Sequence, residues 1–314
     1  MYQTETLKPT PDGLAHAAEI LCKHELVAFP TETVYGLGGD ARSNIAVARI
    51  FDAKARPHFN PLIVHVPDLA AAIDIAKFSD HALDIAAAFW PGPLTLVLPL
   101  NLDAKLSDLV TAGLPTVAIR VPAHPVAQAL LRAFGGPVAA PSANPSGRMS
   151  PTRAAHVLDG LSGRIAAVLD GGACAVGVES TILGLDGTPT LLRPGGIPIE
   201  ALEAMIGHPL PVGGDASKPS APGQFASHYA PNADLRLNAS EPAKDEIYIG
   251  FGPAPFTLSA SRDLVEAAAN LFHILRQADR LAGPNGHIAI APIPETGLGR
   301  AINDRLRRAA APRA

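Results

Sequence analysis

The chain has few aromatic residues, few charges and almost no cysteine. Aromatic residues make up 5% of its 314 residues and charged residues 17%, whereas 47% are hydrophobic. A core built from so many aliphatic side chains is large enough for the chain to fold without cross-links. The two cysteines, Cys22 and Cys174, form no metal-ligand pattern. We expect reduced, partly buried thiols, with a single disulfide as the alternative.

The sequence also lacks an excess of positive charge, a long apolar run and a signal-peptide pattern. Its formal net charge is -4, which argues against a protein whose whole surface binds nucleic acid but leaves room for a local basic cleft. No uninterrupted apolar run reaches membrane-spanning length. The N-terminal residues do not have the basic-then-apolar build of a signal peptide. We therefore expect a cytoplasmic protein without membrane contact.

Common nucleotide-binding and catalytic signatures are absent as well. The sequence has no GxxxxGK[ST] loop, no kinase signature, no HExxH and no GxSxG. The segment 36–41 matches a loose GxGxxA pattern, but residues 31–35 separate it from the preceding strand and no acidic residue follows at the expected distance. We interpret its glycines as positions where the backbone turns with positive φ or approaches a ligand closely.

Both strand and helix patterns occur in the first two thirds of the chain. Strands are predicted at 25–30, 62–66, 94–99, 116–121, 138–140, 166–169 and 180–184, and helices at 13–24, 45–53, 70–78, 81–89, 125–133 and 152–158. Because the two kinds of element do not alternate strictly, we expect an α/β domain with a mixed sheet.

Proline, glycine and serine crowd together at 209–222, which predicts a linker. Beyond it, strand patterns at 246–251 and 287–292 accompany helical patterns at 263–281 and 299–308. We therefore divide the chain into a first domain at 1–208, a linker at 209–233 and a second domain at 234–314. The second is near the smallest size that folds unaided, so we expect it to dock on the first.

Two short polar signatures interrupt this apolar background. One is Lys54-Ala55-Arg56-Pro57, with Asn60 after it, and the other is Ser142-Ala143-Asn144. Their side chains can hold phosphate or carboxylate oxygens, and the first leads into a predicted strand, where α/β proteins tend to bind ligands. Taken alone, the first is more simply a helix end and the second an ordinary turn.

Other polar residues lie in or beside predicted strands, and each of them alone is weak evidence for a ligand-binding site. The segment 31–36 offers hydroxyls that could fix a small ligand, or is a plain turn. His65 by itself would be a core histidine. The segments 179–181 and 192–196 carry a single charge each, and Cys174 is most simply a small buried hydrophobe.

The motifs gain specificity from their order. FPTETVYGLG, KARP with NPLIVH, WPGPLTLVLP, VAIRVPAHP, APSANPSG, VESTI and LLRPGGI follow one another over residues 29–197. The series closely resembles the YrdC/Sua5 family of L-threonylcarbamoyladenylate synthases, and SHYAP at 227–231 and GLGRAI at 297–302 are similar to its two-domain Sua5 form. The resemblance implies a YrdC-like twisted mixed sheet with a concave cavity, a small Rossmann-like α/β C-terminal domain, and a linker that folds over the active site.

The resemblance also implies a nucleotidyltransferase reaction. L-threonine, bicarbonate (or CO₂) and ATP would give threonylcarbamoyl-AMP, diphosphate and water, the intermediate for threonylcarbamoyladenosine at position 37 of tRNA. Mg²⁺ would be held by the ATP phosphates and not by protein side chains. A separate transferase would use the product, and a weak tRNA contact is expected. The alternatives are a non-catalytic RNA-binding or assembly factor and another carbamoyl-adenylate-forming enzyme.

The same motifs carry the family's functional residues onto this chain. Threonine would contact Thr33, His65, Arg120, Ser180 and the backbone of Ala140. ATP would contact Arg56, Asn60, Thr116, Ser142, Ser150, Arg193 and Tyr229. The catalytic signatures would comprise Lys54, Arg56, Ser142 and Asn144. Gln224, Phe225, Ala226 and Ser227 stand where the family often has Met-Lys-Tyr-Arg, so the lid should contribute less charge and more apolar cover.

Overall fold

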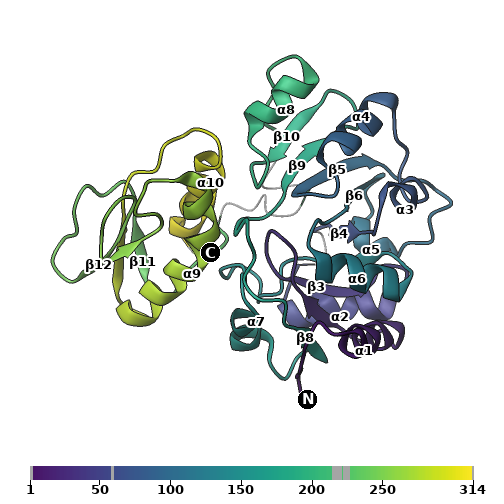
Figure 1. Ribbon diagram of the computed structural model, residues 1–314, viewed down its shortest axis with the longest axis horizontal. Coiled ribbons are helices and arrows are strands. Elements are labelled where there is room, and N and C mark those ends of the chain that lie inside the picture. Colours follow the sequence, from purple (N-terminus) through teal and green to yellow (C-terminus); the bar gives the residue numbers. More distant parts are fainter. Residues whose placement is uncertain (1–2, 58–59, 214–220, 222–226, 313–314) are drawn as a thin grey trace.

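The structure is a computed structural model that describes residues 3–57, 60–213, 221 and 227–312. Two sheets divide it into two units: a mixed ten-stranded sheet in the first and a four-stranded parallel sheet in the second. Figure 1 shows the second unit, in green and yellow, beside the first. The predicted α/β class, with one large mixed sheet and a second, smaller sheet, is confirmed.

The large sheet has the strand order β1-β8-β2-β3-β7-β4-β6-β5-β9-β10. Its strands are β1 Glu5–Leu7, β2 Val27–Phe29, β3 Gly36–Asp40, β4 Ile63–His65, β5 Leu94–Pro99, β6 Thr116–Arg120, β7 Val138–Ala139, β8 Ala167–Leu169, β9 Thr181–Gly184 and β10 Thr190–Arg193. Near its centre, β4 is parallel to β6 and antiparallel to β7. This register makes His65 and Arg120 partners on adjacent strands.

Helices of the first unit surround this sheet. They are α1 Pro11–Cys22, α2 Asn44–Lys54, α3 Leu69–Ile73, α4 Asp80–Phe89, α5 Asp108–Thr111, α6 Pro125–Phe134, α7 Ala154–Leu161 and α8 Ile199–Ile206. Side-chain caps define the starts of several of them: Thr10 accepts from the backbone of Gly13 before α1, and Ser43 accepts from that of Ala46 before α2. Helix α2 ends at Lys54 and is followed by the capping residue Ala55, whose left-handed φ of 50° turns the chain back.

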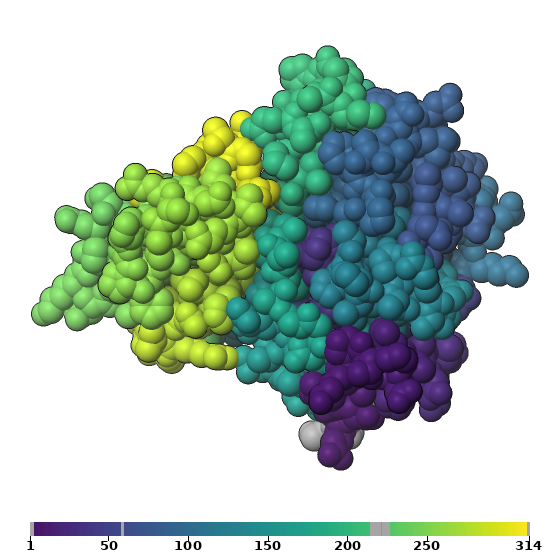
Figure 2. Space-filling model, viewed as in Figure 1, coloured from purple at the N-terminus to yellow at the C-terminus, as the bar shows by residue number. Residues whose placement is uncertain are grey.

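The second unit is built from β11 Asp234–Arg236, β12 Glu246–Gly250, β13 Phe256–Thr257, α9 Leu264–Ala282, β14 His287–Ile290 and α10 Gly299–Ala310. Its strands lie in the order β11-β14-β12-β13. Helix α10 lies on the side of this unit that faces the first unit (Figure 1). In Figure 2 the green and yellow atoms of the second unit abut the teal atoms of the first.

The two units share apolar packing. The hydrophobic cluster around Phe272 and Leu275 of α9 also contains Val34, Met149 and Val178 of the first unit. A shared core of this kind holds two units in one orientation better than a wet surface contact does. The position of the second unit relative to the pocket described below is therefore set by hydrophobic burial.

Two local predictions are wrong, each because of contacts made elsewhere in the chain. The helix predicted at 70–78 ends at Ile73, because Ala76 pairs with Leu100 and draws the chain toward β5. For the glycines at 36–39, the prediction of a turn with positive φ is wrong, because they lie in strand β3; the alternative, a close approach to a ligand, stays a prediction, and Gly36 lines the pocket described below. A Cβ at Gly38 would come within 2.8 Å of the Phe29 ring on β2, so glycine is required there by close packing.

Cys22 and Cys174 are both free thiols, as expected; Cys174 is buried, whereas Cys22 is exposed and not partly buried as predicted. Among the helices that the structure describes, none is both long enough and apolar enough to cross a membrane.

Candidate active site

Most of the predicted site residues meet in one pocket of the first unit. The pocket contains about 550 Å³ of empty space, its open mouth included. Nine of the predicted residues line it: Thr33, Arg56, His65, Arg120, Ala140, Ser142, Ser180, Arg193 and Tyr229. They come from segments between residues 33 and 229, so the pocket gathers the ordered motifs that are spread along the sequence.

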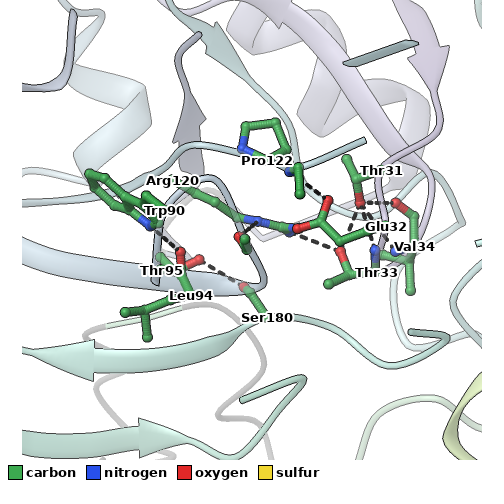
Figure 3. A network of polar contacts seen from close by, with 12 residues as sticks. Thr31, Glu32, Thr33, Val34, Trp90, Leu94, Thr95, Arg120, Pro122 and Ser180 are labelled. Carbon is green, nitrogen blue, oxygen red and sulfur yellow. Dashed lines mark hydrogen bonds and ion pairs between the residues drawn. The ribbon is translucent and has the colours of Figure 1, made fainter. Parts of the chain in front are cut away.

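One end of the pocket is built around Arg120, the last residue of β6. Its Nε donates to the carbonyl oxygen of Gly92 at 3.2 Å, its Nη1 to Oγ1 of Thr33 at 2.8 Å, and its Nη2 to Oε1 of Glu32 at 2.6 Å. Figure 3 shows the side chain extended toward Glu32 and Thr33. These described contacts use three of the five N–H groups of the guanidinium and fix its plane.

Glu32 orients Arg120 and was not among the predicted site residues. Its second oxygen, Oε2, accepts from the backbone nitrogen of Ala123 at 3.1 Å, and the carboxylate is almost entirely buried. A buried ion pair of this kind persists only if both charges are well bonded. The signal in the sequence was that Glu32 is the one charged residue of the segment FPTETV. If that segment is buried, its carboxylate needs a cationic partner elsewhere in the fold.

Ser180 connects the two ends of the pocket. Its Oγ lies 2.7 Å from Oγ1 of Thr95 on β5, a contact that the sequence did not reveal and that Figure 3 shows. On its other side, Nη2 of Arg193 donates to the carbonyl oxygen of Ser180 at 2.9 Å and to its Oγ at 3.2 Å. The hydroxyl is thus held from two directions.

His65 lies in β4 beside Arg120. Its ring is 3% exposed, and Nδ1 lies 3.3 Å from the carbonyl oxygen of Ile63. Burial, aided by the charge of Arg120, lowers the pKa of His65 to about 3. The ring is therefore neutral at physiological pH. A neutral ring that donates from Nδ1 has its lone pair on Nε2, which can accept a hydrogen bond.

The other end of the pocket contains Arg56 and Arg193. The guanidinium of Arg56 donates to backbone carbonyl oxygens, from Nη2 to Pro61 at 3.0 Å and from Nε to Asn60 at 3.4 Å. Burial lowers the pKa of Arg56 to about 10 and also lowers that of Arg193. Arginine remains charged at neutral pH under such shifts. Two buried cations lining one cavity are typical of a site for an anion.

Lys54 does not line the pocket. Its buried ammonium donates to the carbonyl oxygens of Ser142 and Asn144. Burial, together with the charge of Arg56, holds the pKa of Lys54 well below its usual range. The two polar signatures are therefore in direct contact, since the lysine of the first fixes the loop of the second.

The remaining predicted residues also lie outside the lining. The side-chain nitrogen of Asn144 donates to the carbonyl oxygens of Pro145 and Arg148 at 2.8 and 2.9 Å. The Oδ1 atoms of Asn60 and Asn144 are buried, and neither has a hydrogen-bond partner among the described residues. Thr116 is the first residue of β6, at the opposite end of that strand from Arg120.

A carboxylate, Glu179, lies among these arginines. Its Oε1 accepts from the hydroxyl of Ser150, and its Oε2 accepts from Nε of Arg305 at 2.6 Å. Burial alone would raise the pKa of Glu179, but the charges of Arg305 and Arg193 and the bond from Ser150 outweigh burial and lower it to about 2. Glu179 is therefore ionised at neutral pH.

Arg305 lies on α10 and was missed by the sequence analysis. It shares the buried face of that helix with Ala301, Ile302, Leu306 and Ala309. An arginine at helical spacing within an apolar stripe was the available signal, because a buried guanidinium needs an acidic partner. The identity of that partner could not be read from the sequence.

Tyr229 and His228 close the pocket beside these charges. Tyr229 is 1% exposed, with its ring centroid 4.0 Å from that of His228 and 5.7 Å from that of Phe272. Burial raises the pKa of Tyr229 and lowers that of His228 to about 3. Of the linker residues that depart from the family pattern, Gln224, Phe225 and Ala226 lie outside the described residues, and Ser227 is half-buried.

Two family models match this chain in sequence. The Sua5/YciO/YrdC model, described as telomere recombination, matches residues 19–195. The model described as the C-terminal domain of threonylcarbamoyl-AMP synthase matches residues 197–311.

Curated proteins and a solved structure are similar over nearly the whole chain. The threonylcarbamoyl-AMP synthase of Bacillus subtilis is 44% identical and covers 98% of this chain and 95% of its own length. That of Pyrococcus abyssi is 42% identical, covering 93% and 92%. The crystal structure of Pyrococcus abyssi Sua5 complexed with L-threonine has a TM-score of 0.89 at 38% identity and covers 98% of this chain and 97% of that one. As the ordered motifs predicted, the chain belongs to the YrdC/Sua5 family, in the two-domain form.

Proposed function

We propose that this protein is an L-threonylcarbamoyl-AMP synthase, an enzyme that joins L-threonine, bicarbonate and ATP and releases diphosphate and water. The observation that carries the proposal is a single pocket lined by three arginines, Arg120, Arg56 and Arg193. An amino-acid carboxylate and a triphosphate are the two anions that such a pocket would hold together. The activity named for the relatives requires both ligands.

At the Arg120 end, the pocket offers what threonine needs. Arg120 is oriented by Glu32 and has N–H groups beyond those bonded to described residues, so it would bind the carboxylate. The neutral ring of His65 and the hydroxyls of Thr33 and Ser180 would bind the amine and the hydroxyl. Ala140 lines the same pocket, and its backbone would also contact threonine. We call this region the threonine end.

At the opposite end, which we call the nucleotide end, ATP would contact Arg56, Ser142 and Arg193 with its phosphates and Tyr229 with its ring system or ribose. Asn60, Thr116 and Ser150 would complete the contacts that the family pattern assigns. Lys54 and Asn144 act by shaping the loop at 142–144, as the bonds from the lysine to this loop indicate. The unpaired Oδ1 atoms of Asn60 and Asn144 support a polar ligand nearby.

Mg²⁺ enters the proposal with ATP, bound to its phosphate oxygens, where it would neutralise charge as diphosphate leaves. The donor set of the pocket fits this arrangement. Of the described residues that line it, only Glu179 carries a carboxylate, and both of its oxygens are already bonded, to Ser150 and Arg305. The arginines suit phosphate oxygens and would not coordinate a metal ion.

The chemistry needs positioning more than acid–base catalysis. The amine of threonine takes up bicarbonate or CO₂ to form a carbamate, with loss of water in the case of bicarbonate. A carbamate oxygen then attacks the α-phosphorus of ATP as the bond to the β-phosphate breaks. Fixed cations and N–H donors stabilise the charge that develops on the departing diphosphate. The chain forms no covalent bond to substrate in this scheme.

Several parts of the proposal concern the product and the linker. Residues 209–233 would connect a catalytic domain at 1–208 to a domain at 234–314 and would place Tyr229 over the nucleotide. A downstream transferase would move the threonylcarbamoyl group to tRNA, with at most a weak tRNA contact here. The cytoplasmic location predicted from the sequence stays a prediction.

The test is a diphosphate-release assay on the purified chain. Release is expected only when ATP, L-threonine and bicarbonate are all present. No turnover with threonine, or equal turnover with serine, would contradict the proposal. Replacement of threonine by carbamoyl phosphate tests for a different carbamoyl-adenylate enzyme, and tight, salt-sensitive tRNA binding without turnover would indicate an RNA-binding factor.

A further inference from the structure

Arg305 belongs to the second unit, yet its side chain is buried beside the pocket of the first. Only 1% of its surface is exposed, whereas Arg300 and Arg307 on the same helix are exposed and pair with surface carboxylates. Burying a guanidinium is unfavourable unless its N–H groups find acceptors. Its partners therefore indicate why it lies there.

Each nitrogen of Arg305 has an acceptor. Nε donates to Oε2 of Glu179 at 2.6 Å, Nη1 to Oδ2 of Asp304 at 2.5 Å, and Nη2 to the carbonyl oxygen of Pro194 at 3.0 Å. In addition, Cζ lies 5.1 Å from the ring centroid of Tyr229, within cation–π distance. The guanidinium thus bridges a carboxylate of its own unit and a carboxylate of the other.

The contacts outside α10 all lead to the nucleotide end. Glu179 accepts the hydrogen bond from Ser150, Pro194 directly follows Arg193, and Tyr229 lines the pocket. In the proposed function, Ser150, Arg193 and Tyr229 are contacts of ATP. Arg305 is therefore in a position to orient three ATP contacts at once.

Charge gives Arg305 a second role. Glu179 lines the pocket and is ionised, so an unpaired carboxylate there would repel a triphosphate. The guanidinium of Arg305 neutralises it at 2.6 Å. Without Arg305, ATP would have to bind beside a buried negative charge that has lost its closest partner.

We propose that Arg305 is the positioning residue through which the second unit completes the ATP site, acting through Glu179, Ser150 and Tyr229. This inference rests on the proposed function. It explains why an arginine of the second unit is buried at the pocket of the first. Threonine binding should not depend on Arg305, because Arg120 is held by Glu32 within the first unit.

The first test compares two ligands on the full chain with Arg305→Gln. Calorimetry with α,β-methylene-ATP, which cannot release diphosphate, should show about a 10- to 100-fold loss of affinity, as expected for a lost charge-assisted contact and an unpaired carboxylate. L-threonine affinity should change by less than about threefold. Arg300→Gln is the matched control: its pair with Glu200 also joins α10 to the first unit but lies at the surface, so both affinities should be unchanged.

The second test separates positioning from a purely structural effect. Glu179→Gln in the Arg305→Gln background removes the unpaired carboxylate while leaving an amide oxygen for the Ser150 hydroxyl, so most of the lost nucleotide affinity should return. If Arg305→Gln fails to fold, Arg305→Lys replaces it in the first test only. It keeps a charge for Glu179 but loses the planar fork that also bonds Pro194 and contacts Tyr229, so nucleotide affinity should fall by about 3- to 10-fold while threonine affinity is unchanged.

Wild-type nucleotide affinity in the Arg305 variant, or equal loss of both ligands with no rescue by Glu179→Gln, overturns the inference. Failure of the proposed function would differ, because the unmodified chain would then release no diphosphate with threonine and bicarbonate.

Discussion

The two ends of the pocket are held together in different ways. At the threonine end, Arg120 is fixed by Glu32, Thr33 and Gly92, all within the first unit. At the nucleotide end, Glu179 is bonded to Arg305, which comes from the second unit. The first arrangement is complete once the large sheet has formed, whereas the second also requires the two units to dock. Ligand affinities measured separately should therefore respond to different substitutions.

The largest effect is expected from Arg56→Ala at the nucleotide end. Loss of this buried cation should reduce adenylate formation by about 100- to 1,000-fold, since the charge that stabilises departing diphosphate is removed. The fold should survive, because the hydrogen bonds of the Arg56 side chain to described residues go to the nearby carbonyl oxygens of Asn60 and Pro61, and its backbone bond to Phe51 does not need the side chain. Diphosphate release and thermal unfolding measure the two outcomes.

The control for this prediction is Arg49→Ala on the same helix, where the side chain is partly exposed and pairs with Glu25. That variant should keep both activity and stability. An Arg56→Ala protein that unfolds would assign the arginine a structural role instead.

Arg120→Ala should produce the next largest effect, at the opposite end. Threonine affinity is expected to fall about 100-fold, because the carboxylate loses its partner and Glu32 is left buried without a cation. Affinity for α,β-methylene-ATP should change by less than about threefold. Calorimetry with each ligand measures the two losses of affinity. Equal losses for threonine and for the nucleotide would show that the two ends are not independent.

Tyr229→Ala should have a smaller effect, confined to the nucleotide end. Removing the ring that Arg305 and Phe272 contact should lower the affinity for α,β-methylene-ATP by about tenfold. This is the size expected for a lost stacking and cation–π contact. Tyr229→Phe keeps the ring and serves as the matched control, with affinity near that of the unmodified chain. If both variants weaken the nucleotide equally, the hydroxyl, and not the ring, is responsible.

Acidification should act on both ends of the pocket, and its effect is expected on the stability of the fold and not directly on ligand affinity. His65 and His228 have pKa values lowered to about 3 by burial, below the usual value of 6.5 in an unfolded chain. Between pH 6.5 and 3 the unfolded chain binds more protons, so stability is lost as pH falls through this range. Each of these two histidines should lower the free energy of unfolding by about 1 to 2 kcal/mol when the pH falls from 7 to 5.

Urea unfolding at both pH values measures this loss. His228→Asn should remove the part of the stability loss that His228 causes and leave the part that His65 causes. A free energy of unfolding that does not change with pH would contradict the prediction.

Sequence periodicity predicted the elements whose form depends on local pattern. Helices α1 and α6 have apolar faces and clear stops, and both were placed within a few residues. Strand β3 was missed because its glycines resemble a turn, whereas Gly38 is there to make room for Phe29 on another strand. Helix α3 was drawn too long because pairing of Ala76 with Leu100 involves a distant segment. Errors arose where non-local contacts override the local pattern.

The same division applies to the site. Motif order placed nine lining residues, including Arg56 and Arg120, in one pocket. It did not reveal Glu32, Thr95 or Arg305, which matter through the side chains they contact. The tertiary fold decides which residue each of these side chains contacts. A single sequence shows that a residue is charged or polar but does not show its partner.

The long separation between Glu179 and Arg305 has a consequence during protein synthesis. Their bond spans 126 residues, which a ribosome adding about 5 to 20 residues per second needs roughly 6 to 25 s to translate. During that interval a nascent chain can already form the bond between Glu32 and Arg120, which spans only 88 residues. In the proposed function, an unfinished chain would thus acquire the contact that orients Arg120 toward the amino acid before it acquires the contact from Arg305 that completes the nucleotide end.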